Sequence, residues 1–371
     1  MNPWLKGALI TLAILGVSVG AQYGLPVIIP DTAWRQLLLD TLVKVVVALS
    51  LNVVNGMAGQ FSIGHAGFVG IGAYTAAITA SHLQQSMHPG ISIANIPLES
   101  SFVVVPAAMI AAAIAAGAFG LLVGLPSLRL KGDYLALVTL GFAEIIRQVI
   151  SGTSAAISPL IAQLGGVNGY LGADGHGVPQ YAGPFWIVGV ALWAIVIAWR
   201  LKFSGWGRAL RALREDEIAA AAVGVDPTRY KVTSFVIAAM GGGVAGSLLA
   251  LVYDGSPSVQ PASYSVVASF EAITMVILGG SGSISGAVLG AIFVTLSVRL
   301  IEQVQGIDSV RDFVRAHPNF DLNALRMVLY AATLIGLMIL RPAGVFGERE
   351  LSLARFFPKK AKAASPAKEK G

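Results

Sequence analysis

Long apolar runs alternate with short polar connections along most of this chain. Each run is close to the length of about 20 residues that crosses a hydrocarbon core as a helix. The runs are apolar on all sides rather than at alternate positions, which predicts membrane helices and not barrel strands. We expect about ten spans, near residues 7–29, 36–54, 67–85, 102–125, 134–150, 184–200, 232–253, 266–279, 286–301 and 325–341.

The first, eighth and ninth spans differ from the others. The first run continues past residue 21, so we interpret it as a membrane span and not as a cleaved signal peptide. The eighth and ninth are short, and the glycine-rich break GGSGSISG at 279–286 separates them. This break predicts either a tight turn or a re-entrant kink.

The stretch LNVVNGMAGQFSIGHAGFVGIG, residues 51–72, interrupts the apolar pattern with polar residues among glycines: Asn52, Asn55, Gln60, Ser62 and His65. Irregular backbone at membrane depth persists only where protein or a water-lined cavity covers its polar groups. The polar side chains are therefore candidates for a transport path, with helix–helix packing as the alternative for each. His65 has no neighbouring cluster of ligand residues, so we expect no metal site.

Several charged residues fall inside predicted spans, and three of them are candidates for the path. Glu144 and Arg147 are three positions apart and can pair on one helix face, either structurally or facing a pore. Glu271 has no basic neighbour within one turn. It is satisfied by another helix, protonated, or exposed to an aqueous gate, and is a third candidate for the path.

Composition supports a polytopic all-α membrane protein. Of the 371 residues, 55% are hydrophobic and 12% charged, about half the charged share of soluble domains. The absence of cysteine excludes disulfides, thiolate metal sites and cysteine nucleophiles. The chain contains no P-loop, HExxH or GxSxG pattern, so we expect neither an enzyme nor a cofactor, and the energy for transport must come from a partner or an ion gradient.

The net charge of +6 follows membrane topology rather than a nucleic-acid surface. Most of the 25 basic residues lie in the segments that are cytoplasmic if both termini are inside, whereas 86–100, 152–183 and 254–265 hold none. We therefore predict a permease domain at 1–347 with a cytoplasmic loop at 201–231. Residues 348–371 form a basic tail that we expect to be disordered.

The loop 205–231, GWGRALRALREDEIAAAAVGVDPTRYK, predicts a short amphipathic helix. Arg208, Arg211 and Arg214 recur every three residues, and Gly224 before Asp226-Pro227 is placed to end the helix. A basic loop that only fixes topology does not need an ordered, alanine-rich face. We favour a docking element for a cytoplasmic partner.

Five motifs occur in order: LNVVNGMAGQFSIGHAGFVGIGAYTAA, LRLKGDYLALVTLGFAEIIR, ALREDEIAAAAVGVDPTRYKVTSFVIAA, VILGGSGSISGAVLGA and RPAGVFG. Together they resemble the M-type subunit of the H/M permease pair in branched-chain amino-acid ABC importers, the high-affinity leucine/isoleucine/valine importer family. The resemblance spans about residues 35–347.

The resemblance implies a subunit of the bacterial inner membrane that pairs with a homologous second permease, two cytoplasmic ABC ATPases and a periplasmic binding protein. It also implies that 208–224 carries the coupling helix that contacts the ATPase. In the family pattern a glycine follows the acidic residue by six positions, but Gly224 follows Glu217 by seven. The candidate coupling residues are Arg208, Arg211, Arg214, Glu215, Asp216, Glu217, Ala219, Ala220 and Gly224.

These observations predict a permease for branched-chain or related aliphatic amino acids, driven by partner ATPases. Urea, amides and other amino acids remain alternative substrates. The alternative class is an ion-driven secondary transporter in which Glu271 or Glu144 couples the ion.

Overall fold

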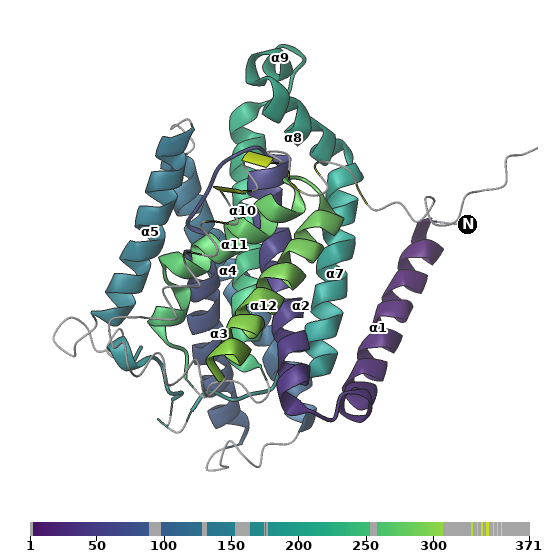
Figure 1. Cartoon of the computed structure of the whole chain (residues 1–371), viewed down its shortest axis with the longest axis vertical. Coiled ribbons are helices and arrows are strands. Elements are labelled where there is room, and N and C mark those ends of the chain that lie inside the picture. Colours follow the sequence, from purple (N-terminus) through teal and green to yellow (C-terminus); the bar gives the residue numbers. More distant parts are fainter. Residues whose placement is uncertain are drawn as a thin grey trace, which may run out of the picture.

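The computed structural model describes residues 3–88, 98–127, 132–152, 164–173, 175, 177–252 and 258–306, and isolated positions between 328 and 350. Within these ranges the chain is a bundle of helices (Figure 1). The long helices are α1 (Pro3–Ile28), α2 (Thr32–Asn52), α3 (His65–Met87), α4 (Ser101–Ser127), α5 (Asp133–Ser151), α7 (Pro184–Phe203), α10 (Pro227–Leu251), α11 (Val266–Gly279) and α12 (Ile284–Gly306).

The short elements lie at the two ends of the bundle. They are the π-helix η1 (Val53–Met57), the 3-10 turns η3 (Leu98–Ser100), η4 (Gly166–Asn168) and η5 (Pro261–Tyr264), and the helices α8 (Gly205–Glu215) and α9 (Glu217–Ala222). Figure 1 shows α8 and α9 projecting from one end. Two isolated bridges, Tyr170 with Val259 and Ala182 with Val252, join loop segments to each other and to the end of α10.

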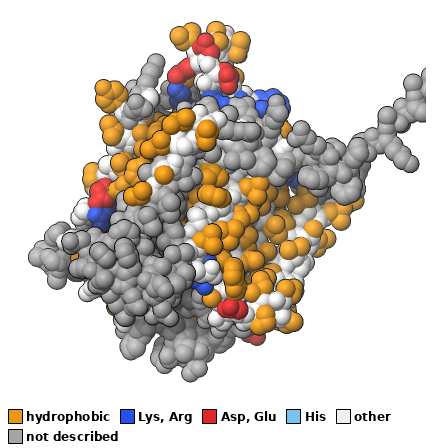
Figure 2. All heavy atoms as spheres, in the orientation of Figure 1, with side chains coloured by type: hydrophobic (Ala, Val, Ile, Leu, Met, Phe, Trp, Pro, Cys, Tyr) orange, Lys and Arg blue, Asp and Glu red, His pale blue; other side chains and the backbone are white. Residues whose placement is uncertain are grey.

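Helices α2 and α10 form the centre of the bundle. Helix α10 packs against α2, α3 and α4, while α2 also contacts α7, α11 and α12. In both central helices 67% of the most apolar stretch is buried, against 11% in α1, which packs mainly on α7 at the edge (Figure 1). The edge helices therefore leave apolar side chains exposed, as a lipid-facing surface requires. Figure 2 shows hydrophobic side chains over the face that carries α12. The exposed apolar residues of α12 include Phe293, Leu296 and Leu300.

The helices follow the predicted spans closely. Six are long and apolar enough to cross a membrane: Gly7–Ile28, Thr32–Met57, Ser101–Pro126, Tyr134–Ser151, Pro184–Phe203 and Pro227–Leu251. Helices α11 and α12 supply shorter apolar stretches. The chain is thus a multi-pass all-α membrane protein, while the tenth predicted span, 325–341, lies largely outside the described residues.

The break at 279–286 forms a tight turn between α11 and α12. Only four residues, 280–283, separate α11 from α12, and Gly280 and Gly282 have φ angles of 115° and 88° that favour glycine. The two helices then run back against each other. A methyl group at Gly290 would lie 1.9 Å from the Met275 carbonyl oxygen, so the backbones are in direct contact.

Small residues bring the central helices equally close. A methyl group at Gly72 would lie 2.3 Å from the Gly243 carbonyl oxygen, and one at Gly246 would lie 2.0 Å from that of Val69. Because lipid provides little hydrophobic drive for helix association, such close packing is a main source of stability. It also lets α3, which is rich in glycine and alanine, lie inside the bundle.

We predict that Gly246→Ala destabilises the protein, because the added methyl meets backbone atoms that no rotamer change can move. Overpacking of this kind costs about 1–3 kcal/mol. Thermal denaturation of the detergent-purified protein measures the effect. Gly16→Ala in α1 is the control, since nothing lies within 4 Å of a methyl group there. Equal melting temperatures for the two variants would contradict the close α3–α10 contact.

Candidate functional site

The loop between α7 and α10 forms two helices, so the single helix that we expected up to Gly224 is wrong. Asp216 lies between α8 and α9 in extended conformation, with φ −153° and ψ 112°. Its carboxylate accepts hydrogen bonds from the backbone N–H groups of Ile218, at 2.8 Å, and Ala219, at 3.0 Å. Asp216 thus caps the start of α9, a role that its short acceptor side chain favours.

Helix α8 is anchored to the bundle. Leu210 and Leu213 are buried, and Trp206 stacks on Tyr230 of α10 with 6.5 Å between ring centroids. The Ser204 hydroxyl accepts the Gly207 N–H at 3.1 Å and caps α8 directly after α7 ends. The helix is therefore fixed both to α7 and to α10.

Helix α9, in contrast, is an exposed apolar tip. Ile218 is 84% exposed and Val223 is 79% exposed, while Ala219, Ala221 and Ala222 are also at the surface. Figure 2 shows hydrophobic and acidic side chains together at this end, with basic side chains just beneath. Exposed apolar side chains on an ordered projection are typical of a protein-docking surface.

Local contacts hold both ends of α9 in place. Gly224 has a φ angle of 91°, and the next N–H, of Val225, bonds back to the Ala220 carbonyl at 3.1 Å. The predicted left-handed helix end at Gly224 is therefore present. Lys231 of α10 lies 2.6 Å from the Glu217 carboxylate and ties α9 to the membrane helix that follows.

The glycine-rich break after α2 packs against the α11–α12 turn. Helix α2 passes into η1, and Asn52 at their junction is fully buried. The Asn52 amide donates to the Ser283 carbonyl at 3.1 Å and accepts from the Gly282 N–H at 2.8 Å. A methyl group at Gly56 would lie 2.3 Å from the Gly282 nitrogen, so the two breaks share one interface.

The arginines of α8 reach this interface. Arg214 donates to the Gly56 carbonyl at 2.7 Å, and Arg211 lies 3.4 Å from the Lys202 carbonyl oxygen at the end of α7. Together with Lys202, Gly207 and Gly282 they line a small cavity. Arg208 is exposed and donates to the nearby Phe203 carbonyl, at 3.3 Å.

The other polar residues of the break bond within the protein. The Asn55 amide contacts both the N–H and the carbonyl of Ser62, at 3.2 and 3.1 Å, and His65 Nε2 lies 2.8 Å from the Ser50 hydroxyl on α2. These contacts favour the packing interpretation for Asn55, Ser62 and His65. Gln60 is buried, and among the described residues nothing bonds to its side-chain amide.

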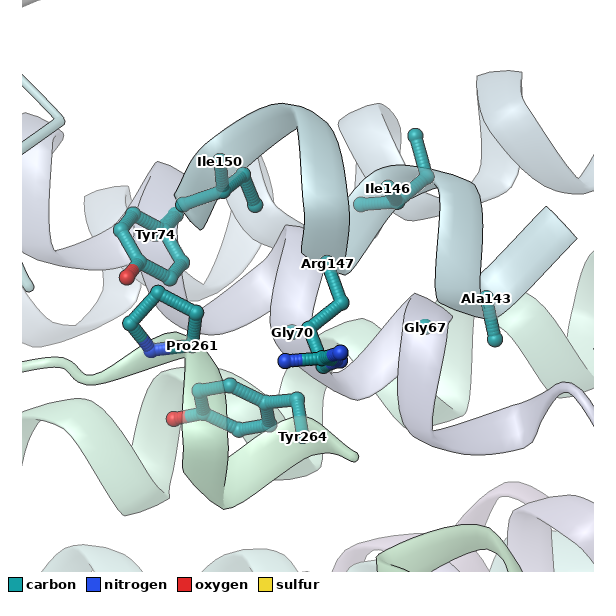
Figure 3. Close-up of a pocket in the computed structure, with 9 residues that line it drawn as sticks. All are labelled: Gly67, Gly70, Tyr74, Ala143, Ile146, Arg147, Ile150, Pro261 and Tyr264. Atoms are coloured by element: carbon teal, nitrogen blue, oxygen red, sulfur yellow. The ribbon is translucent and has the colours of Figure 1, made fainter. Parts of the chain in front are cut away.

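Glu144 and Arg147 form the pair that their spacing predicts. Arg147 Nε donates to Glu144 Oε2 at 2.9 Å, a second guanidinium nitrogen contacts Oε1, and Gln148 donates to Oε1 at 3.0 Å. The Arg147 guanidinium lies beside Tyr264 in a shallow pocket between α3, α5 and η5 (Figure 3). Glu271, on α11, is only 8% exposed.

Sequence reasoning missed Lys202 and Glu350. We assigned Lys202 to the positive-inside loop and Glu350 to the tail, yet their side chains form an ion pair of 2.5 Å in which both are largely buried. Burial raises the pKa of Glu350, but hydrogen bonds from the Ile284 N–H, Lys202 and Ser285 outweigh it and hold that pKa below its usual range. The remainder of the predicted tail lies outside the described residues.

Comparison with known proteins places this geometry in context. The family described as the permease component of branched-chain amino acid transport systems matches residues 35–338. The high-affinity branched-chain amino acid permease LivM of Escherichia coli is 32% identical over 82% of this chain and 68% of its own. A probable LivM of Methanocaldococcus jannaschii is 26% identical, and LivH of Salmonella typhimurium is 25% identical, each over 82% of this chain and 91% of its own. No solved structure gives a significant match.

We predict that Asn52→Leu lowers stability, because it leaves the Gly282 N–H and the Ser283 carbonyl buried without their partner. Each stranded group costs about 1–3 kcal/mol. The measurement is the thermal transition of the purified protein. Thr79→Val is the control, since the Thr79 hydroxyl bonds at 2.8 Å to a carbonyl of its own helix. If the melting temperature of Asn52→Leu equals that of the control, the two hydrogen bonds of Asn52 contribute little to stability.

Proposed function

Because this chain belongs to the branched-chain amino acid transport permease family, as an M-type subunit, we propose that it forms part of the membrane path of an ABC importer for branched-chain or related aliphatic amino acids. The permease subunits of such transporters are not enzymes, and this chain contains no P-loop of its own. Its transport energy therefore comes from separate ATPase subunits.

The proposed assembly contains several partners. The relatives include both M-type and H-type permeases, which supports a pair of homologous permeases. We assign to this pair two cytoplasmic ABC ATPases, a periplasmic binding protein and a place in the bacterial inner membrane. The binding protein supplies the substrate, so most of the selectivity for a given amino acid resides there.

The observation that carries this proposal is the exposed tip α9 on the anchored helix α8. An ion-driven transporter needs no ordered apolar projection outside the bundle. A partner ATPase, however, needs a surface that it can bind and a rigid route into the membrane helices. Ile218, Ala219 and Val223 supply that surface, and α8 supplies the route.

The proposed mechanism follows the contacts of α8. Closure of the ATP-bound ATPases displaces α9, and α8 carries the displacement to α7, to η1 through Arg214, and to α10 through Trp206. The permease pair then changes from inward-open to outward-open, and the binding protein releases its ligand into the path. Low affinity within the path lets the substrate leave it quickly.

We place part of the path along α5. This helix carries Glu144, Arg147 and Gln148 on one face, and charges at membrane depth are stable when paired and facing water or protein. A zwitterionic substrate presents one carboxylate and one ammonium group, which complement such a pair. Glu271 and Gln60 are further candidates, since each is a polar side chain buried in the bundle.

The first test separates an ATP-driven importer from an ion-driven one. We expect vesicles that contain the permease pair alone to accumulate no labelled leucine under a proton or sodium gradient. Addition of the ATPases, the binding protein and internal ATP restores uptake. Robust uptake by the pair under an ion gradient alone would overturn the ABC mechanism.

The second test concerns the docking tip. Ala219→Glu adds volume and charge to the exposed patch, and Gly224→Val places a β-branched residue at positive φ, at a cost of about 1–2 kcal/mol. We expect normal membrane insertion but loss of ATP hydrolysis stimulated by the loaded binding protein. Ala219→Ser is the matched control, since it keeps a small uncharged side chain at the same exposed position. Wild-type stimulation in both tip variants would remove 208–224 from the coupling route.

A further inference from the structure

The Glu350 carboxylate joins two parts of the bundle that are far apart in sequence. One oxygen accepts the Ile284 N–H at 2.8 Å and lies 2.5 Å from Lys202 Nζ. The other accepts the Ser285 N–H at 3.0 Å and the Ser285 hydroxyl at 2.7 Å, with the Ser283 hydroxyl at 3.4 Å. The first oxygen therefore contacts both parts at once, and the second contacts the start of α12 and the residue before it.

The first part is the N-terminus of α12. The first N–H groups of a helix have no partner within it, and the helix dipole favours an anion there. Glu350 satisfies two of these groups, although it comes from a segment more than 60 residues later. Gly344, six residues earlier, also lies against the α11–α12 turn, since a methyl group there would lie 2.5 Å from the Gly280 Cα atom. Gly344 and Glu350 thus both contact this turn.

The second part is the corner between α7 and α8. Lys202 is in the last turn of α7, is only 5% exposed, and precedes the first residue of α8 by three positions. Arg211 of α8 lies against the Lys202 carbonyl oxygen. A displacement of α8 therefore moves Lys202 directly.

Glu350 closes a ring of polar contacts around this end of the molecule. From α8 the ring runs through Arg214 to Gly56, then from Asn52 to the α11–α12 turn. From that turn it returns through Glu350 to Lys202 and α8. Glu350 thus adds a second connection between α8 and the turn, beside the one through the glycine-rich break.

We propose that Glu350 is a positioning residue that makes the α7–α8 corner and the start of α12 move together, so that ATPase-driven displacement of α8 reaches the α11–α12 hairpin. The proposal rests on the function proposed above. Glu350 touches no substrate in this role and acts through Lys202 and the α12 N-terminus. Loss of Glu350 uncouples ATP hydrolysis from transport. It does not abolish the binding of the ATPases or of the periplasmic binding protein.

The experiment uses the complete importer in vesicles, with labelled leucine, and measures substrate moved per ATP hydrolysed. Glu350→Gln removes the charge and one acceptor at nearly constant volume. We expect stimulated ATP hydrolysis to persist while the transport ratio falls about tenfold, the effect on an equilibrium of losing one charge-assisted hydrogen bond. Glu99→Gln on η3, an exposed carboxylate away from α8, is the matched control and retains the wild-type ratio.

A double-mutant cycle tests the route through Lys202. We expect Lys202→Met to lower the ratio as Glu350→Gln does, and the double variant to be no worse than either single one, since both remove the same link. Multiplied losses in the double variant would mean that the two residues act separately and would overturn the proposal.

Amounts of assembled complex separate positioning from simple stability. If Glu350→Gln lowers the yield or melting temperature but leaves the transport ratio of the assembled complex unchanged, the proposal is wrong. If Glu350→Gln does not assemble, Glu350→Asp decides in its place, since it keeps the charge but shortens the reach, and an unchanged ratio there also overturns the proposal. Failure of the proposed function is distinct, because wild-type protein would then transport without ATP.

Discussion

Polar backbone groups that leave regular helix inside this bundle must find partners in the protein, because hydrocarbon offers none. The two glycine-rich breaks meet this constraint together. Asn52 satisfies the Gly282 N–H and the Ser283 carbonyl, Arg214 satisfies the Gly56 carbonyl, and Glu350 satisfies the first N–H groups of α12. Five helices are fixed to one another at this end as a result. The site that we assign to coupling is therefore also the place where the fold closes.

Close helix packing makes these contacts possible. Glycines at the α3–α10 and α11–α12 crossings leave no space for a methyl group, so the helices pack backbone against backbone. In a bilayer such packing replaces much of the hydrophobic drive that assembles soluble proteins. It also lets α3, which is rich in glycine and alanine, lie buried in the bundle.

The loop that we propose as the docking site contains two helices with different surroundings. Helix α8 commits its apolar face and two of its arginines to the bundle, which makes it a rigid base. Helix α9 commits little beyond Ala220 and presents an apolar surface outward. The change of direction at Asp216 separates the two helices. In the function that we propose, a partner that binds α9 therefore moves α8, which contacts α7, α10 and η1.

The sequence by itself determined the membrane class, most helix positions, the Glu144–Arg147 pair, the glycine end of α9 and the family. The family follows from the resemblance of five motifs, and the others from short-range patterns that solvent and helix geometry impose on neighbouring residues. The break at Asp216 is also local, since an aspartate before an alanine run is an N-cap signal that we did not use. Only the tertiary structure decided that Asn52 meets Gly282 and that Glu350 meets Lys202. Hydrophobic periodicity specifies which face of a helix is buried, whereas the partner of a buried polar group depends on which distant segment the packed bundle brings within hydrogen-bond distance.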